Sequence, residues 1–346
     1  MVGMSRRDVI RLGVGGIAFT GLGLGAVAPA GAADRTWPLT AIPPAALNPT
    51  GIKVLASASR IAVPSYRFGV VVRSGISATA GSGSVTMEAA ADLVGVGLEQ
   101  LRAIADSAHA DFMTQLAATG REIVPVPDMV ASAGYARLEP TPVPFFKKPF
   151  ADARTIAMVA PNSLPLISQH SDAPISDKSP MALGNWRAIN QMCVDLQCVV
   201  MIPSIVIDFA QLSGSGHSVH GGSAQVGVQP GLFLVPLFTQ LSAHFARIAI
   251  AGPGGKIILK DRVTIGQAGE LVKSSSHNNR AEVDLWNSLG RWDANAAPGS
   301  RPTQAYDYST YEYRVDPAQF ATACLDAART MNRIYVDAAN VNRPAS

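Results

Sequence analysis

The first candidate site of this chain is a pair of histidines three positions apart, whose residue type and spacing would allow them to bind a metal ion. His217 and His220 lie in Ser213–Ser223, a run rich in Gly, Ser and His between two apolar segments. Imidazoles at this spacing on a loop can both reach one metal ion, and they suit zinc or copper. No Asp, Glu or Cys follows at ligand spacing, so a third ligand would have to come from elsewhere in the fold. We therefore predict no cofactor, with a metal ion at this loop as the alternative.

A segment rich in aromatic residues is the second candidate. His277–Tyr313 contains Trp286, Trp292, Tyr306, Tyr308, Tyr311 and Tyr313. Flat rings cover the apolar faces of a polysaccharide or peptide at low entropic cost, which favours a ligand-binding surface. The same rings would also pin an irregular segment to a sheet, and the sequence leaves both interpretations open.

The motifs of common enzymes are missing. Gly216–His220 departs from the Gly-x-Ser-x-Gly nucleophile elbow at its last position. Gly81 and Gly83 follow a predicted strand, but neither a third Gly nor Gly-Lys-Ser/Thr completes a phosphate-binding loop. No Cys lies in an electropositive loop that would activate a thiolate. We predict no catalytic residues.

The N-terminal residues read as an export signal. Ser5–Ile10 fits the twin-arginine motif, in which two arginines are followed by one residue and two apolar ones. An apolar, Gly-rich stretch over Leu12–Val27 and small residues around Gly31 complete a cleavable signal peptide over residues 1–33. We therefore expect a periplasmic or secreted protein. No later stretch has the length and hydropathy of a membrane helix, so we expect no membrane span in the mature chain.

Composition limits the partners and the disulfide content. Charged residues make up only 15% of the chain and its net charge is +3, so we predict no nucleic-acid binding. Three cysteines exclude a disulfide-dense scaffold. Cys193 and Cys198 could pair in an oxidising compartment. Burial of all three as small core residues is the alternative that we favour, because Cys198 opens an apolar strand.

Hydrophobic periodicity predicts an α/β fold, with a mixed sheet of about six to seven strands, an antiparallel hairpin and long flanking helices. We expect one domain over residues 65–346, preceded by a Pro- and Ala-rich extended leader over residues 34–64. The organising block is Leu196–Val272, interpreted as four successive strands. The predicted strands are Tyr66–Arg73, Ile123–Val126, Thr155–Ala160, Val199–Phe209, a run from Ala224, Ala243–Ala251 and Lys256–Ile265. The predicted helices are Val85–Ala118, Pro180–Asp195 and a C-terminal helix that Asp316 caps and Pro317 begins, while Ser74–Ser84 is expected to be a flexible loop.

The order of these elements resembles the periplasmic α/β fold of the curli-secretion pore family. The resemblance covers residues 66–272, and its hairpin reads like Arg247–Ala251, a Gly turn and Lys256–Leu259. In that family the segment that matches Gln211–Val235 forms membrane-spanning β-hairpins. This chain lacks the family's lipid-anchoring Cys, because its first Cys is Cys193. The resemblance therefore implies the fold and a role in envelope assembly or secretion.

Together these features predict an exported, non-catalytic envelope protein that binds a protein partner or polymer, or that assists assembly or secretion. One alternative is an exported enzyme without a recognisable motif, assisted by a metal at His217 and His220. Another is a self-associating structural subunit, which would form a homo-oligomer.

Overall fold

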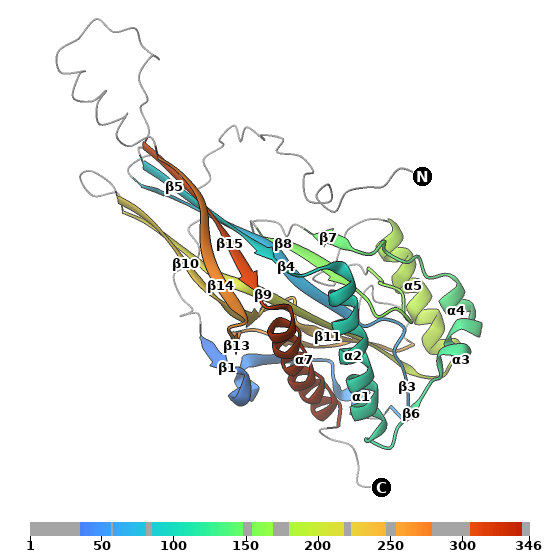
Figure 1. Cartoon of the computed structure of the whole chain (residues 1–346). Helices are drawn as coiled ribbons and strands as arrows, with labels where there is room; N and C mark the ends of the chain where they lie inside the picture. The colour runs from blue at the N-terminus through green and yellow to red at the C-terminus, as the bar shows by residue number, and fades with distance from the viewer. Residues whose placement is uncertain are drawn as a thin grey trace, which may run out of the picture. The chain divides into compact units, whose positions relative to one another are not determined.

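The computed structural model describes residues 35–56, 58–80, 85–147, 154–168, 180–217, 223–246, 254–278 and 305–340. These residues form a mixed α/β fold around one large, curled sheet (Figure 1). The strands are β1 (Thr36–Pro38), β2 (Leu47–Thr50), β3 (Arg60–Ala62), β4 (Arg67–Ala80), β5 (Val85–Val94), β6 (Glu122–Ile123), β7 (Phe145–Lys147), β8 (Thr155–Val159), β9 (Val199–His217), β10 (Ser223–Leu234), β11 (Gln240–His244), β12 (Gly255–Leu259), β13 (Arg262–Gly266), β14 (Gly269–Asn278) and β15 (Ala305–Val315). The helices are α1 (Lys53–Ala56), α2 (Leu98–Ala117), α3 (Val126–Ala131), α4 (Ala133–Ala136), α5 (Pro180–Asp195) and α7 (Pro317–Asn340), with short 3-10 turns η1 (Leu39–Ala41) and η2 (Pro44–Ala46).

Strand β9 is the centre of the sheet. The main strand order is β1-β13-β10-β9-β4-β5-β15-β14, with the remaining strands branching from it in a 15-stranded sheet. β9 pairs antiparallel with β10 and β11 and parallel with β3 and β4. Val199 and Met201 belong to the core that α2 and α7 share, whereas Val200 and Ile202 belong to a second core with α5. Burial on both faces explains why β9 is almost entirely apolar over its first half.

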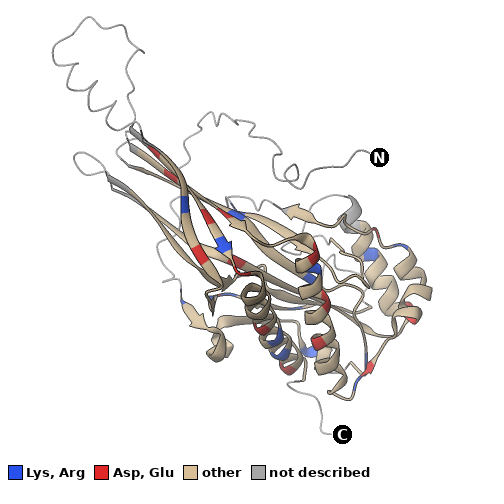
Figure 2. Ribbon diagram, viewed as in Figure 1, with Lys and Arg blue, Asp and Glu red and all other residues tan. Residues whose placement is uncertain are grey.

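The two longest helices lie side by side (Figure 1). α2 buries Leu101, Ala105, Ala108, Phe112 and Leu116 on one face, and α7 buries Phe320, Cys324, Ala327, Met331 and Tyr335. The predicted cap of α7 is confirmed, since the backbone N–H of Gln319 donates to Oδ1 of Asp316 at 2.8 Å. Charged residues of both signs are interspersed along these two helices (Figure 2).

The predicted helix over Val85–Ala118 is wrong in its first part. Leu98–Ala117 is helical, but Val85–Val94 is strand β5, and Gly95 with a φ of +102° separates the two elements. The predicted loop over Ser74–Ser84 is also wrong as far as Ala80, because β4 continues to that residue. Hydrogen bonds to neighbouring strands override the helix propensity of the Ala-rich stretch in β5.

The organising block contains more strands than predicted. An antiparallel hairpin is present, but its first strand differs from the predicted Ala243–Ala251: β11, Gln240–His244, pairs with β12 in the register Gln240↔Ile258. Residues 247–251 of the predicted strand lie outside the described residues. The run Lys256–Ile265 is not one strand: it turns at Asp261, and β13 pairs instead with β10 and β1. The first two residues of the predicted turn over residues 252–255 lie outside the described residues, and Gly255 already begins β12.

Residues 35–62 add strands to the sheet. β1 pairs parallel with β13, β2 pairs antiparallel with β12, and β3 pairs parallel with β6 and β9. The indole nitrogen of Trp37 donates to Asp261 at 3.0 Å and fixes β1 beside β13. The N-terminal segment therefore belongs to the same compact unit as the rest of the described chain.

Candidate functional site

Three antiparallel hairpins end at the same end of the sheet. Their terminal pairs are Ala80↔Val85 in β4–β5, His217↔Ser223 in β9–β10 and Asn278↔Asp307 in β14–β15. β15 runs parallel to β5 from the pair Ala305↔Val85, which places the ends of these two hairpins next to each other. We call these strand ends the β-arm, defined as residues 74–80, 85–92, 211–217, 223–230, 269–278 and 305–312 (Figure 1).

Small side chains allow the β9–β10 hairpin to lie against the β4–β5 hairpin. Ala78, Met87 and Val226 form a small apolar cluster between them. A Cβ atom built on Gly214 would lie 3.2 Å from Cδ1 of Ile76 and 3.3 Å from Cβ of Ala78. The hairpins approach closely because Gly214 has no side chain.

A buried carboxylate lies where the β-arm joins the body of the sheet. Asp208 of β9 is only 3% exposed, and its Oδ2 lies 3.3 Å from Nη1 of Arg154, just before β8. Oδ1 accepts a hydrogen bond from the backbone N–H of Ala210 at 3.3 Å and a longer one from the Ser74 hydroxyl at 3.5 Å. Burial raises the pKa of Asp208, and the positive charge of Arg154 opposes this shift without cancelling it. These contacts join β9 to β4 and to the start of β8.

A row of charges crosses the same region on the adjacent strands. Arg73, Asp92 and Glu312 are in register across β4, β5 and β15. Nε of Arg73 lies 3.7 Å from Asp92, and Nη2 of Arg314 lies 2.9 Å from Glu312. Burial raises the pKa of Asp92, Arg73 lowers it, and Glu312 raises it further. The Arg73–Asp92 pair joins β4 to β5 and stabilises their pairing, whereas Arg314 and Glu312 lie two residues apart on the same strand, β15. The row contains no nucleophile beside a base.

The predicted aromatic set is divided between the two faces of β15. Tyr313 is fully buried, its ring stacks on Phe209 with centroids 5.8 Å apart, and its hydroxyl oxygen accepts the backbone N–H of Ala268 at 3.2 Å. Tyr311 is half-buried against the same core, and Tyr308 is half-buried on the opposite face, as the alternation of a strand requires. Tyr306 belongs to β15, but its side chain, like Trp286 and Trp292, lies outside the described residues. Packing thus accounts for Tyr313, and ligand binding by the other residues stays a prediction.

The predicted loop Ser213–Ser223 is wrong as far as His217, because β9 continues to that residue, and residues 218–222 lie outside the described residues. His217 is the last residue of β9 in the pairing with Ser223, and His220 lies in the part of the chain that is not described. Within the described ranges, no group of three or more His, Cys, Asp or Glu residues is placed to hold a metal ion. The prediction of a metal at His217 and His220 is therefore untested.

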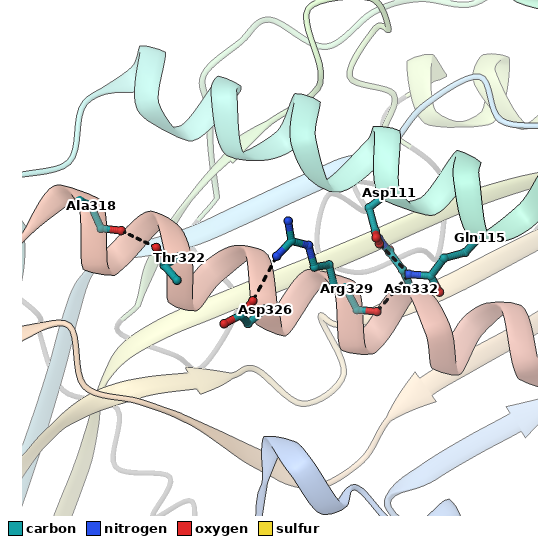
Figure 3. Close-up of polar contacts among 7 residues, drawn as sticks. All are labelled: Asp111, Gln115, Ala318, Thr322, Asp326, Arg329 and Asn332. Atoms are coloured by element: carbon teal, nitrogen blue, oxygen red, sulfur yellow. Dashed lines mark hydrogen bonds and ion pairs between the residues drawn. The ribbon is translucent and has the colours of Figure 1, made fainter.

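A partly buried polar network lies away from the β-arm, between α2 and α7 (Figure 3). The amide nitrogen of Asn332 donates to the Ala108 carbonyl at 2.9 Å and to Oδ2 of Asp111 at 2.8 Å. The amide of Gln115 donates to the same Asp111 oxygen at 2.7 Å. The hydroxyl of Tyr66, next to β4, donates to Asn332 at 2.9 Å, and burial raises the pKa of Tyr66 well above its usual range. The network holds the two helices on the sheet.

Neither Asp208 nor Asn332 is among the residues that the sequence predicts for a site. The signal for Asp208 was present, since it is a lone carboxylate in an apolar strand, and a buried charge needs a partner. Asn332 could have been found as a polar residue on the apolar stripe of α7.

Comparisons with known protein families, with curated proteins and with solved structures found no match to this chain. None of the described helices is long and apolar enough to cross a membrane. The fold and the candidate site define a mixed α/β protein with a β-arm built from three hairpins.

Proposed function

We propose that this chain is an exported, non-catalytic envelope protein whose β-arm binds a protein partner or polymer, or assists assembly or secretion. One observation carries the proposal: the three hairpins end together. Both segments singled out in the sequence, one with His220 and one with Trp286 and Trp292, connect strands of these hairpins. A binding surface composed of several chain segments needs such convergence.

The open edge of the β-arm suits a protein partner. Among the described strands, β14 pairs on one side only, with β15. Its exposed residues Lys273, Ser275 and Ser276 are polar. An extended segment of a partner can add to such an edge through backbone hydrogen bonds. We also propose that long helices flank the body of the sheet, as predicted, and leave the β-arm available to the partner.

The same edge supports a second candidate function, a self-associating subunit. The outer edge of β10 over residues 223–230 also pairs with no other described strand, because β13 pairs only with Leu232–Leu234. Two open edges on one chain allow head-to-tail pairing of copies.

Site-specific photo-crosslinking in intact cells tests the binding proposal. A photoreactive residue replaces Ser276 on β14 or Gln229 on β10, and the matched control replaces exposed Arg333 on α7. Adducts with an envelope protein or polymer from the β-arm positions, but not from Arg333, support the proposal. Adducts with a second copy of the chain favour self-association, and a lack of adducts from both β-arm positions contradicts both functions.

Export and cofactor content are tested separately. Changing Arg6 and Arg7 together to Lys should leave the uncleaved chain in the cytoplasm, whereas Arg11→Lys, in the same N-terminal segment, should not. Stoichiometric zinc, copper or iron in the exported protein, lost when His217 and His220 are both changed to Ala, would favour the metal-assisted enzyme instead.

A further inference from the structure

Helix α5 ends in a Schellman motif that contains two cysteines. The backbone N–H of Cys198 donates to the carbonyl of Cys193 at 3.2 Å, and the N–H of Gln197 donates to the carbonyl of Val194 at 3.3 Å. Gln197 has a φ of +48°, the left-handed conformation that the motif requires at this position. The two nested hydrogen bonds and the positive φ identify the motif without reference to the side chains.

The motif brings the side chains of Cys193 and Cys198 together. They occupy the two positions, one in the last turn of the helix and one just after it, whose side chains commonly contact each other in a Schellman motif. Both belong to the same apolar core, and both are free thiols that are only 2% and 8% exposed. The proximity also acts electrostatically, since Cys198 contributes to the raised pKa of Cys193.

A cavity gives small molecules access to the pair. It has a volume of about 400 Å³, and its lining includes Cys193, Cys198, Arg60 and Gln197. Arg60 is held there by a hydrogen bond from Nη1 to the Leu196 carbonyl at 2.7 Å and an ion pair with Glu122 at 2.9 Å. The thiols therefore lie just beneath the surface, beside a fixed positive charge.

We propose that Cys193 and Cys198 form a dithiol site that closes to an intramolecular disulfide when it meets a disulfide-containing oxidant. The inference goes beyond the proposed function, because it concerns the end of α5 and needs no partner at the β-arm. The disulfide would join the last turn of α5 to the residue before β9.

The reaction is thiol–disulfide exchange in two steps. The thiolate of Cys198 attacks one sulfur of the oxidant, forms a mixed disulfide and releases one thiolate of the oxidant. The thiolate of Cys193 then attacks the sulfur of Cys198 and releases the second. Two protein thiols are oxidised, the oxidant disulfide is reduced to two thiols, and the protons of the cysteines pass to the released thiolates.

Cys198 is the better first nucleophile. Burial raises the pKa of Cys193 to about 12 and that of Cys198 to about 11, the latter opposed by the positive charge of Arg60. Cys198 is also the more exposed of the two. Cys324 provides a matched control, because it is a fully buried thiol in the main core, on α7.

The experiment equilibrates the purified chain with mixtures of reduced and oxidised glutathione, then alkylates the remaining thiols in denaturant, where buried thiols become accessible, and measures intact mass. We expect two of the three thiols to become resistant to alkylation. Before alkylation, the oxidised protein should weigh about 2 Da less than the reduced protein. Digestion should give a peptide fragment in which Cys193 is linked to Cys198. Cys324→Ala should behave in the same way, whereas Cys193→Ala and Cys198→Ala should not form the bond.

The wild-type protein alone can overturn the inference, so the result does not depend on the folding of the variants. Three alkylated thiols at the most oxidising mixture, a bond that involves Cys324, or a stable glutathione adduct on Cys198 would each contradict it. The outcome is independent of crosslinking at the β-arm, so failure of the dithiol site and failure of the proposed function are distinguishable.

Discussion

The hydroxyl of Tyr66 donates a hydrogen bond of 2.9 Å to the side-chain carbonyl of Asn332, and both residues are fully buried. Asn332 uses its amide nitrogen for Ala108 and Asp111 of α2. One asparagine thereby joins α7 to α2 and to the residue that precedes β4. Because the contacts of Asn332 with Tyr66 and Ala108 are buried, their loss should lower the free energy of unfolding.

The first prediction concerns this contact. Tyr66→Phe removes the donor and leaves Oδ1 of Asn332 buried without it, so we expect the free energy of unfolding to fall by about 1–3 kcal/mol. Urea denaturation measures the change. The matched control is Thr322→Val, which removes a hydroxyl bonded to the Ala318 carbonyl on the exposed face of α7 and should change stability by less than about 0.5 kcal/mol. Equal losses of stability in the two variants would show that the buried hydrogen bond contributes no more than the exposed one, which would contradict the prediction.

The second prediction concerns the pH dependence that Asp208 confers. Burial raises its pKa in the folded chain, so the folded state binds the proton more tightly than the unfolded state does. Protonation of Asp208 therefore stabilises the folded state. This stabilisation is fully present below the pKa of Asp208 in the unfolded chain and is lost as the pH rises through its pKa in the folded chain. The stability of the wild type relative to Asp208→Asn should therefore increase as the pH falls from neutral toward about 4. Urea unfolding of both proteins across this pH range measures the difference in their free energies of unfolding. A difference that stays constant, or that decreases as the pH falls, would contradict the prediction.

The third prediction concerns the packing between hairpins of the β-arm. Gly214→Val places carbon atoms where Ile76 and Ala78 already lie, so we expect a loss of about 1–3 kcal/mol and faster amide exchange in β4 and β10. Gly97→Ser is the control, since no atom lies within 4 Å of a Cβ at Gly97 and the residue caps α2 without a side-chain hydrogen bond. The control should be neutral or raise stability by about a few tenths of a kcal/mol. Unchanged exchange in Gly214→Val would contradict the close approach of the hairpins.

The fourth prediction concerns the rate at which the dithiol site oxidises. Only the thiolate attacks a disulfide, and burial holds the pKa of Cys198 at about 11. The rate with oxidised glutathione should therefore rise about tenfold per pH unit from neutral pH upward. Alkylation at timed intervals measures it. A rate that does not depend on pH would mean that Cys198 is not the attacking group.

The hydrophobic pattern of the sequence predicted those elements that pack a continuous apolar surface against their neighbours. The apolar run Val199–Phe209 and the stripe of α7 each bury a continuous surface, so strand β9 and the C-terminal helix follow from the sequence. β5 could not be predicted in this way. Its Ala-rich sequence favours a helix, and only pairing with β4 and with β15 from the far end of the chain makes it a strand.

The candidate site was predictable only in part, because local composition does not show which residues share a face of a strand. Tyr308 and Tyr313 were grouped by composition, but in a strand they lie on opposite faces, and Tyr313 packs into the core. The sequence does not separate the two faces, because the segment is expected to be irregular and not a strand. The convergence of the hairpins depends on which strands are neighbours in the sheet, and no short-range pattern contains that information.

The parallel pairing of β5 with β15 also constrains when the chain can fold. Val85 is synthesised long before its partner Ala305, which follows it much later in the chain. Until then one edge of β5 has no neighbour, and such an edge is prone to aggregation. Contacts of such long sequence separation form slowly. We therefore expect the β-arm to complete only after β15 has been synthesised, and truncation before β15 to yield insoluble protein.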